Sequence, residues 1–412
     1  MTIYSAVRTT GIYCRPGCGA RPRAENVRTF ALAAAAEAAG YRACLRCRPY
    51  RIARAVGDDA PELVCRAVRL IIDGVLDDAT EEALGARLGV SARHLRRMFH
   101  DHLGMTPDQF ARSRRAHFAR RLLDDSDLSI GEVAFASGFG SLRQFNREMR
   151  TVFRAPPREL RERRRRGDRL TADGGLAMRM PFSAPYDWPG VLSFLAARAI
   201  PGVETVAAGV YRRTITLDGA AGLLEIGPGG EDHLLLRAHL PYWEGVIHVF
   251  ERASRLVGVG TGPGSAAARI PGAWGPFEIA VHTVVAAELG HAAARESLGL
   301  LVRRHGTPVA GLEHGLTHAF PSPEALVALD AGEHGLSAPL AESVGALAWA
   351  VRSGAADLDG GAPAAELLAS LTAVPGVDLA AARHIALRLG ASGVLERGGG
   401  TDTTAPLAEV RR

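Results

Sequence analysis

The amino-acid sequence predicts a multidomain α+β protein, and three observations carry this prediction. Two close pairs of cysteines near the N-terminus indicate a small four-cysteine zinc domain. Two successive patterns of short helix, glycine turn and longer helix indicate an all-α domain with tandem helix-turn-helix units. Beyond residue 180, strand-like runs and then a long helical stretch indicate one α+β domain and one all-α domain. We therefore expect domains at 1–56, 61–162, 180–258 and 259–412, with a basic linker at 163–179.

The first domain is defined by Cys14 with Cys18 and by Cys44 with Cys47. Because each close pair can supply two corners of a tetrahedron, the spacing predicts one Zn²⁺ bound by all four thiolates. Two disulfides are the alternative interpretation. The sequence shows no signal peptide and no long apolar span, so we expect a reducing cytoplasm, which favours the metal. Cys65 lies in an apolar helical pattern and is expected to be a small core residue.

The net charge of the chain indicates a polyanionic partner. The chain has 412 residues, a formal net charge of +5 at pH 7 and a sequence pI near 9.2. Its basic side chains are all arginine, so no lysine Schiff base can form. These features favour double-stranded DNA as the partner, with no membrane association, in a bacterial protein of the cytoplasm that associates with the nucleoid.

Residues 6–18, 25–27 and 42–49 resemble the N-terminal zinc domain of the Ada methylation-response proteins. The resemblance implies that Cys14, the first of the four cysteines, accepts a methyl group from a methylated DNA phosphate. A zinc-bound thiol is deprotonated at neutral pH and is therefore a nucleophile without a general base. The residues expected to contact the DNA phosphates are Thr10, Arg15, Arg21, Arg42 and Arg46. For each arginine, a solvated surface position is the alternative.

The second domain contains two helix-turn-helix patterns, at residues 82–99 and 130–150. In the first pattern, Leu95, Met98 and Phe99 recur at the spacing of a helix core face. Two further pairs have the spacing of a capping box and predict where helices begin. These pairs are Asp78 with Glu81 and Ser129 with Glu132.

Polar residues on the second helix of each pattern are candidate DNA contacts, because such groups bind base edges and phosphates from a recognition helix. They are Arg93, His94, Arg96, Arg97, Arg143, Gln144, Asn146 and Arg147. The tandem arrangement, which closes on residues 153–158, resembles the AraC-type DNA-binding domain. This resemblance implies operator binding and activation of transcription, with RNA polymerase as a partner. A solvated helix face is the alternative for either helix alone.

The chain from Met180 onward resembles the AlkA-type 3-methyladenine DNA glycosylases. Residues 181–204 are similar to the start of their N-terminal domain, and strand-like runs follow at 210–217 and 233–240. Residues 270–278 open a segment that resembles their helix-hairpin-helix domain. The resemblance implies an α+β module followed by an all-α module.

Three features of the sequence depart from the glycosylase pattern. The family's Gly-Gln-Gln-Val-Ser stretch reads Ala286–Gly290 here. The hairpin keeps Gly376, which implies a DNA contact, but it has Asp378 where the family has glycine, and a carboxylate there opposes a phosphate contact. The candidate for the family's catalytic carboxylate is Asp402, which follows extra glycines, and the sequence ends ten residues later. We therefore expect a degenerate, shortened domain.

Together these features predict a DNA alkylation repair protein that regulates an adaptive response. We expect single-turnover methyl transfer to Cys14, activation of sequence-specific transcription, and a glycosylase-like half with weak or no activity. Two alternatives stay open. One is a zinc-stabilised transcription factor whose cysteines never react, and the other is an active alkylbase DNA glycosylase with a fused regulator.

Overall fold

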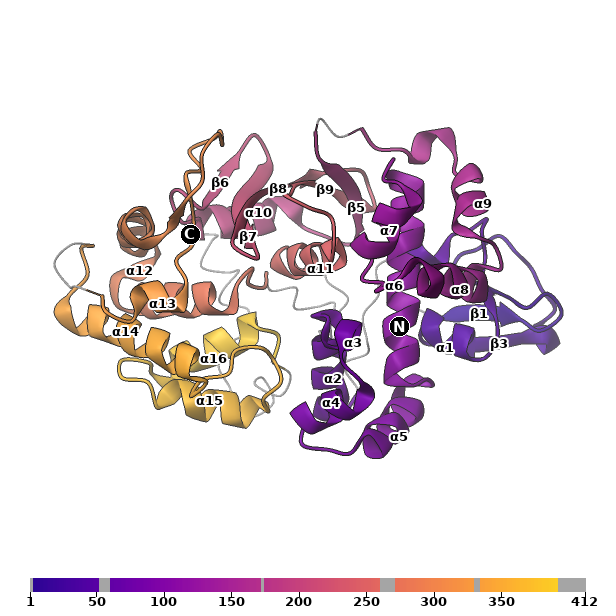
Figure 1. Cartoon of the computed structure of the whole chain (residues 1–412), viewed down its shortest axis with the longest axis horizontal. Helices are drawn as coiled ribbons and strands as arrows, with labels where there is room; N and C mark the ends of the chain where they lie inside the picture. The colour runs from indigo at the N-terminus through magenta and orange to yellow at the C-terminus, as the bar shows by residue number, and fades with distance from the viewer. Residues whose placement is uncertain (1–2, 52–59, 172–173, 260–270, 330–333, 392–412) are drawn as a thin grey trace. The chain divides into compact units, whose positions relative to one another are not determined.

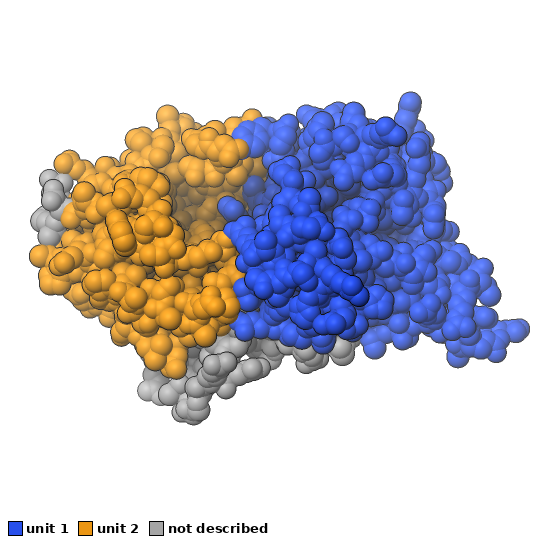
Figure 2. All heavy atoms as spheres, turned by 60° about the horizontal axis from the view of Figure 1, so that its bottom comes forward, with its two compact units in different colours: residues 1–183, 242–254, 259–268 blue, residues 184–241, 255–258, 269–412 orange. Residues whose placement is uncertain are grey.

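The computed structural model describes residues 3–51, 60–171, 174–259, 271–329 and 334–391 (Figure 1). The chain divides into two compact units, which Figure 2 colours separately. Unit 1 comprises residues 1–183, 242–254 and 259–268, and unit 2 comprises residues 184–241, 255–258 and 269–412. The predicted mixed α+β architecture is confirmed. Within the described ranges, no helix is both long enough and apolar enough to cross a membrane.

Unit 1 begins with a small four-stranded sheet of order β3-β1-β2-β4. The elements of this segment are β1 (Tyr4–Val7), β2 (Ile12–Cys14), the 3₁₀ helix η1 (Ala24–Asn26), β3 (Val27–Phe30), α1 (Ala33–Ala38), β4 (Arg42–Ala43) and the 3₁₀ helix η2 (Pro49–Arg51). β2 pairs in parallel with β4, so that Tyr13 lies opposite Ala43. Because parallel strands end at the same edge of a sheet, this pairing brings Cys14 and Cys44 to one edge.

The middle of unit 1 is helical and is organised around one long helix. Its elements are α2 (Glu62–Ile72), α3 (Val75–Asp78), α4 (Glu81–Arg87), α5 (Ala92–Leu103), α6 (Pro107–Asp125), α7 (Ile130–Ala136), α8 (Leu142–Phe153), α9 (Pro157–Glu162) and the 3₁₀ helix η3 (Arg166–Asp168). Helix α6 contacts α1, α2, α5, α7, α8 and α9, and is therefore the central helix of the unit (Figure 1). The remaining elements of unit 1 are β5 (Leu176–Pro181) and most of α11 (Val246–Leu256). Residues 246–254 of α11 belong to unit 1, and its last two residues belong to unit 2.

Both predicted helix-turn-helix patterns are present, as α4 with α5 and as α7 with α8. Leu95 and Phe99 are fully buried, and Met98 packs against the same core from a half-buried position, as their spacing predicts. Gly85 makes the close turn between α4 and α5 possible, since a Cβ there would lie 2.7 Å from the carbonyl oxygen of Val90. Cys65 is buried in α2, as expected of a core residue.

One of the two predicted capping boxes is confirmed and the other is wrong. The side chain of Ser129 accepts a hydrogen bond from the backbone N–H of Glu132, whose carboxylate accepts one from the Ser129 backbone. Asp78 instead ends α3, and Thr80 caps α4 by accepting a hydrogen bond from the backbone N–H of Ala83. The spacing of Asp78 and Glu81 misled the prediction because a separate short helix occupies residues 75–78.

Unit 2 contains an antiparallel sheet. Its first elements are α10 (Trp188–Arg198), β6 (Glu204–Ala207), β7 (Val210–Leu217), β8 (Ala220–Pro228) and β9 (His233–His239). Strands β6 to β9 pair with their sequence neighbours, as hairpins of this spacing do. The predicted strands at 210–217 and 233–240 are therefore confirmed, the second ending one residue earlier.

The rest of unit 2 is almost entirely helical and shares one apolar core. The elements are α12 (Pro276–His305), β10 (Thr307–Pro308), β11 (His318–Ala319), α13 (Pro323–Leu326), α14 (Ala338–Ser353), α15 (Ala364–Thr372) and α16 (Leu379–Arg388). Helix α12 is interrupted at Gly290, where φ is +75° and ψ is 163°. This break falls at the end of the stretch Ala286–Gly290, the first departure from the glycosylase pattern.

Candidate metal centre and DNA-binding elements

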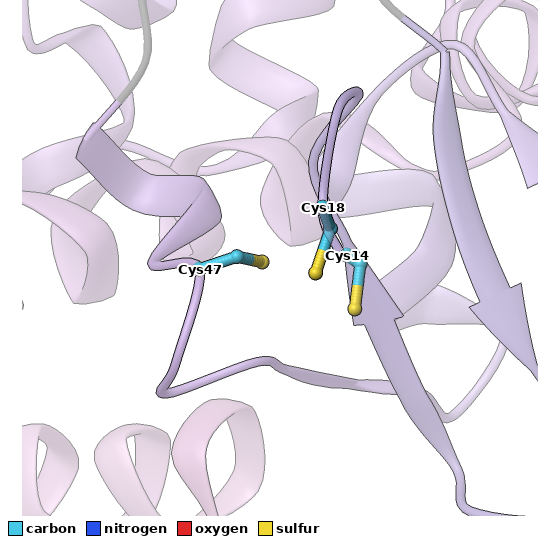
Figure 3. Close-up of side chains that lie close together, drawn as sticks. All are labelled: Cys14, Cys18 and Cys47. Carbon is cyan, nitrogen blue, oxygen red and sulfur yellow. The ribbon is translucent and has the colours of Figure 1, made fainter. Parts of the chain in front are cut away.

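Three thiols of the N-terminal domain point toward one another (Figure 3). Cys14 ends β2, Cys18 lies in the loop that follows, and Cys47 precedes η2. Their Sγ atoms all lie within 4.8 Å of one another. Thiolates about 2.3 Å from a tetrahedral Zn²⁺ stand roughly 3.8 Å apart, so this arrangement fits the metal.

Cys44, the fourth predicted ligand, lies outside this group of three but contacts it. Its backbone N–H donates a hydrogen bond of 3.0 Å to the carbonyl of Tyr13, which follows from the pairing of β2 with β4. Its thiol is hydrogen-bonded to those of Cys47 and Cys14. All four predicted ligands therefore lie in one cluster of sulfur atoms.

The pKa values of these thiols differ from one another because the sulfur atoms lie so close together. Burial, followed by the charges of Cys47 and Cys44, raises the pKa of the Cys14 thiol well above its ordinary value. Burial also raises the pKa of Cys47, to about 12. In Cys44 the backbone N–H groups of Cys47 and Arg46 outweigh burial and lower the pKa. Since several thiolates at this distance repel one another, a divalent cation is the group that allows them to be charged together.

The predicted phosphate-contacting residues of this domain lie close to the ligands in sequence. Four of them are exposed: Thr10, Arg15, Arg21 and Arg46. Arg42 is half-buried in β4. The backbone N–H of Arg15 donates to the sulfur of Cys47, which ties the first cysteine loop to the second. Their role toward DNA stays a prediction.

A polar cluster that the sequence analysis missed joins the metal-binding domain to α6. The hydroxyl of Tyr13 lies 2.5 Å from Oε1 of Glu37, and Nε2 of His117 lies 2.5 Å from the same oxygen. All three side chains are buried or nearly so. Tyr13 is adjacent to Cys14, and His117 belongs to α6. No local motif signals this contact, because the three residues are far apart in the sequence.

A second group of charges fixes the segment after Cys47. Arg48 is buried with φ of +51°, and its Nη1 donates a hydrogen bond of 2.6 Å to Asp168 Oδ2. The hydroxyl of Tyr50 donates to Asp124 Oδ2 at 3.0 Å, and Arg51 Nη2 lies 3.0 Å from Asp125 Oδ1. Residues directly after the predicted ligand Cys47 are therefore bound to the C-terminal end of α6 and to η3.

In the first helix-turn-helix unit, some of the predicted DNA contacts are exposed and one is bound to carboxylates of the protein itself. Arg93 and Arg97 are exposed on α5, and His94 Nδ1 lies 3.0 Å from Arg97 Nη2. Arg96 instead bonds to two carboxylates at the start of α4. Its Nε donates to Glu81, and its Nη2 lies 3.2 Å from Glu82 Oε1. Arg96 therefore helps to hold α5 against α4, which reduces its availability for DNA.

In the second unit, the polar face of α8 is open. Arg143 and Arg147 are exposed, and Gln144 and Asn146 are half-buried. Asn146 Nδ2 donates to the carbonyl of Leu142 at 2.8 Å. The opposite face of α8 is buried and consists of Phe145, Glu148, Met149, Val152 and Phe153. This division between a core face and a polar face is what a recognition helix needs, and the base contacts themselves stay predictions.

In unit 2, the hairpin between α15 and α16 carries the predicted DNA contact Gly376 and the departure Asp378. Gly376 is exposed with φ of +79°, and a Cβ there would lie 2.0 Å from Ser343 Oγ, so the position requires glycine. Asp378 has an ordinary φ of −77° and caps α16, since its Oδ1 accepts from the backbone N–H of Ala381 at 2.7 Å. Asp402 lies outside the described residues.

Models of three domain families match successive parts of the chain. They are the metal binding domain of Ada at residues 2–50, a helix-turn-helix domain at 84–163 and the AlkA N-terminal domain at 177–274. A probable bifunctional transcriptional activator/DNA repair enzyme AlkA of Mycobacterium tuberculosis is 36% identical over 413 residues, which covers 93% of this chain and 82% of that protein. The chain belongs to this family of bifunctional transcriptional activators and DNA repair enzymes. The resemblances to Ada and AlkA proteins are thereby confirmed, and the zinc-binding domain is of the Ada type.

Other relatives of the family match parts of the chain. The bifunctional transcriptional activator/DNA repair enzyme Ada of Escherichia coli is 37% identical over 144 residues, covering 35% of this chain and 39% of that protein. The AdaA protein of Bacillus subtilis is 30% identical over 145 residues, covering 34% of this chain and 66% of that protein. Among solved structures, a 3-methyladenine DNA-glycosylase from Archaeoglobus fulgidus aligns with a TM-score of 0.43 at 19% identity, covering 57% of this chain and 91% of that one.

Proposed function

We propose that the N-terminal domain repairs methylphosphotriesters in DNA by transferring one methyl group to Cys14. The observation that carries this proposal is the cluster of Cys14, Cys18 and Cys47 within 4.8 Å, in a domain that matches the metal binding domain of Ada. In the reaction, the electron pair of Cys14 Sγ forms the S–CH₃ bond while the CH₃–O bond of the phosphotriester breaks. The repaired phosphodiester leaves with the negative charge. Because the product is a thioether, each molecule reacts once.

The residues of the chain contribute position and charge to this reaction. When bound, Zn²⁺ keeps the cysteine sulfurs deprotonated at neutral pH. Cys14 is held by the pairing of β2 with both β1 and β4, which restrains the direction of its sulfur. Arg15 and Arg46 are exposed beside the ligands and are candidates to bind the phosphate oxygens. Cys14 is only 7% exposed, whereas the other three predicted ligands, Cys18, Cys44 and Cys47, are half-buried.

We further propose that methylation switches the protein into a transcriptional activator. Four thiolates on one Zn²⁺ carry a formal charge of about −2, and methylation of one sulfur changes it to about −1. The surface near the ligands then repels DNA less, so phosphate binding tightens. The exposed arginines of α5 and α8 supply the sequence-specific contacts, and RNA polymerase is the proposed partner of the DNA-bound form.

For the glycosylase-like half we propose weak or no base excision. The carboxylate of Asp378 stands on the hairpin that would approach a DNA phosphate. The candidate catalytic carboxylate, Asp402, follows the glycine-rich stretch 398–400. A catalytic carboxylate is effective only when it is held in place against the sugar.

The test of methyl transfer is peptide mapping of the full chain after incubation with duplex DNA that bears methylphosphotriesters. We expect one methyl group per molecule, on Cys14, and no transfer from an unmethylated duplex of the same sequence. A methyl on Cys18, Cys44 or Cys47 would overturn the assignment of the acceptor. Zinc-loaded protein that takes up no methyl group would establish the alternative of a zinc-stabilised transcription factor.

A further inference from the structure

A cavity of about 40 Å³ in unit 2 is lined by apolar, basic and acidic side chains, and the basic ones outnumber the acidic ones. Three of the residues that line it are Arg198 at the end of α10, His282 in α12 and Arg388 at the end of α16. A volume of this size has room for about three water-sized groups, which is the scale of one small oxyanion. Nothing in the proposed methyl transfer or in DNA binding by α5 and α8 uses these residues.

Arg388 is buried with most of its hydrogen-bonding capacity unused. Its side chain is 7% exposed, and its Nη2 donates to the carbonyl of Gly272 at 2.8 Å. Its Nε and Nη1 are buried without a hydrogen-bond partner. In the described part of the chain, no carboxylate forms an ion pair with this guanidinium. A buried cation in this condition is costly unless an anion accompanies it.

His282, on another wall of the cavity, also has a buried nitrogen without a hydrogen-bond partner. Its side chain is 6% exposed, and its Nε2 is buried without a partner. Burial and then the charge of Arg388 lower the pKa of His282 to about 3. Burial and Arg388 likewise lower the pKa of His384, on α16, to about 4. Burial is the larger cause for both imidazoles and the positive charge of Arg388 is the next, and together they keep both imidazoles neutral at pH 7.

The carboxylates nearest to Arg388 do not offset the cost of its burial, because burial and the charge of Arg198 lower its pKa to about 10 against the opposite effect of Glu204 and Glu278. The guanidinium carbons of Arg198 and Arg388 lie 3.9 Å and 5.1 Å from the centroid of the Phe194 ring, so two cations share one aromatic side chain. The two carboxylates that line the cavity, Glu204 and Glu278, are both bound to Arg213. Arg198 also lies beside the exposed His291, with its Nη2 3.0 Å from Nε2.

We infer that this cavity is an anion site that binds a phosphate group through Arg198, His282 and Arg388. Guanidinium groups present paired N–H donors that match the oxygens of phosphate, and a bound anion would satisfy the unused donors of Arg388. The phosphate has two sources with the same chemistry, a free inorganic phosphate ion or a phosphate of the DNA backbone. The inference does not depend on the proposed methyl transfer.

The test is calorimetric titration of the full chain with inorganic phosphate, in a buffer free of other oxyanions. We expect a saturable site whose Kd rises at least tenfold in Arg388→Met. Arg383→Met is the matched control, because Arg383 is exposed on the same helix, and we expect it to leave the Kd unchanged. Without phosphate, Arg388→Met is expected to melt at the same temperature as wild type or higher, since it removes an unpaired buried cation.

Two further arms make the outcome decisive. If Arg388→Met fails to fold, Arg198→Gln changes a half-buried residue of the same cavity and should also raise the Kd at least tenfold. Repeating the titration with saturating duplex DNA separates the sources, because a backbone phosphate in the cavity would abolish binding of the free ion, whereas a site for the free ion would keep its Kd. Absence of a saturable site in wild type, or a Kd that both variants leave unchanged, would overturn the inference.

Discussion

The hydroxyl of Tyr13 donates a hydrogen bond of 2.5 Å to the carboxylate of Glu37. Tyr13 directly precedes Cys14, and the same carboxylate oxygen lies 2.5 Å from Nε2 of His117 in α6. The proposed methyl acceptor is therefore linked, through Tyr13 and Glu37, to the helix around which the helix-turn-helix units pack. Any shift of β2 on methylation would reach α6 through this chain of buried polar groups.

The first prediction concerns the acid stability that Glu37 provides. Burial alone would raise its pKa, but the charge and hydrogen bond of His117 outweigh burial, and the pKa is lowered. A carboxyl group with a lowered pKa stabilises the fold fully above its unfolded pKa of about 4.3, and this stabilisation is lost as the pH falls through the lower folded value. Glu37→Gln should therefore cost roughly 3–5 kcal/mol at pH 7 and flatten the loss of stability below about pH 4.3.

Urea unfolding of the full chain from pH 3 to pH 7, followed by a signal from unit 1, measures this effect. Glu25→Gln is the matched control, because that side chain is 71% exposed and should change little. An identical pH dependence in Glu37→Gln and wild type would contradict the role given to the pair.

The second prediction separates two arginines that sequence patterns treat alike. Arg143 is exposed on α8, so Arg143→Ala should weaken operator binding by about 1–3 kcal/mol if it reaches a base edge. Arg96 bonds to Glu81 and Glu82, so Arg96→Ala should have a smaller effect on affinity and a measurable effect on stability. Fluorescence anisotropy and thermal melting of both variants test the pair. A larger affinity loss in Arg96→Ala would show that the carboxylates release it on DNA.

The third prediction is that methylation of the zinc domain tightens operator binding and that this tightening diminishes as salt rises. Each additional DNA phosphate that the methylated protein neutralises should steepen the slope of log K against log salt by about 0.9. Titrations of methylated and unmethylated protein at a series of salt concentrations measure both slopes. Equal affinities at low salt would remove the charge switch from the proposal.

Sequence and structure agree where local patterns decide the outcome. The cysteine pairs predicted a group of thiols suited to one metal ion, because zinc imposes its spacing on short loops, and the structure brings three of the four within 4.8 Å of one another. The core face of α5 followed from helical periodicity at Leu95 and Phe99. The fixed roles of Gly85 and Gly376 in close turns could be located only in the structure, because they depend on which atoms approach the missing side chain.

Contacts between distant residues were beyond sequence reasoning. The pairing of Tyr13 with Glu37 and His117 joins residues up to 104 positions apart. Arg96 was grouped with the other arginines of α5 because nothing in its own helix reveals that Glu81 and Glu82 lie beside it. The basic cavity of unit 2 is likewise built from α10, α12 and α16, which no local motif connects.

The fourth prediction concerns the hairpin glycine of unit 2. Gly376→Ala should be destabilising by roughly 2–5 kcal/mol, since it combines a strained positive φ with a Cβ 2.0 Å from Ser343 Oγ. Gly354→Ala has a similar φ of +77° and no atom within 4 Å, so it should cost only the strain of about 1–2 kcal/mol. Chemical unfolding of the two variants compares them directly. Equal losses would show that Ser343 moves aside without cost.

The last prediction is that the full chain releases 3-methyladenine from alkylated DNA slowly or not at all. Cleavage of the glycosidic bond develops positive charge on the sugar, and a fixed carboxylate that meets this charge supplies on the order of 3–4 kcal/mol. Asp402 comes two residues after the run Gly398–Gly400 in the sequence, and glycine offers no side chain that could fix the backbone ahead of a catalytic carboxylate. Asp378 adds a negative charge to the hairpin, and within about 5 Å of a phosphate this costs roughly 1–3 kcal/mol.

Release of free bases from alkylated duplex DNA, compared between wild type and Asp402→Asn, decides the matter. The loss of a fixed carboxylate and the repulsion between Asp378 and a phosphate together slow base excision by several orders of magnitude. We therefore expect base release near the background in wild type and the same release in Asp402→Asn. Asp378→Gly, which restores the residue of the glycosylase pattern, should improve DNA binding by the hairpin while sacrificing the cap of α16, worth about 1 kcal/mol of stability. Rapid release that Asp402→Asn abolishes would show a working pocket, and rapid release that survives it would assign the chemistry to another carboxylate, with Glu288 and Glu396 the first to replace.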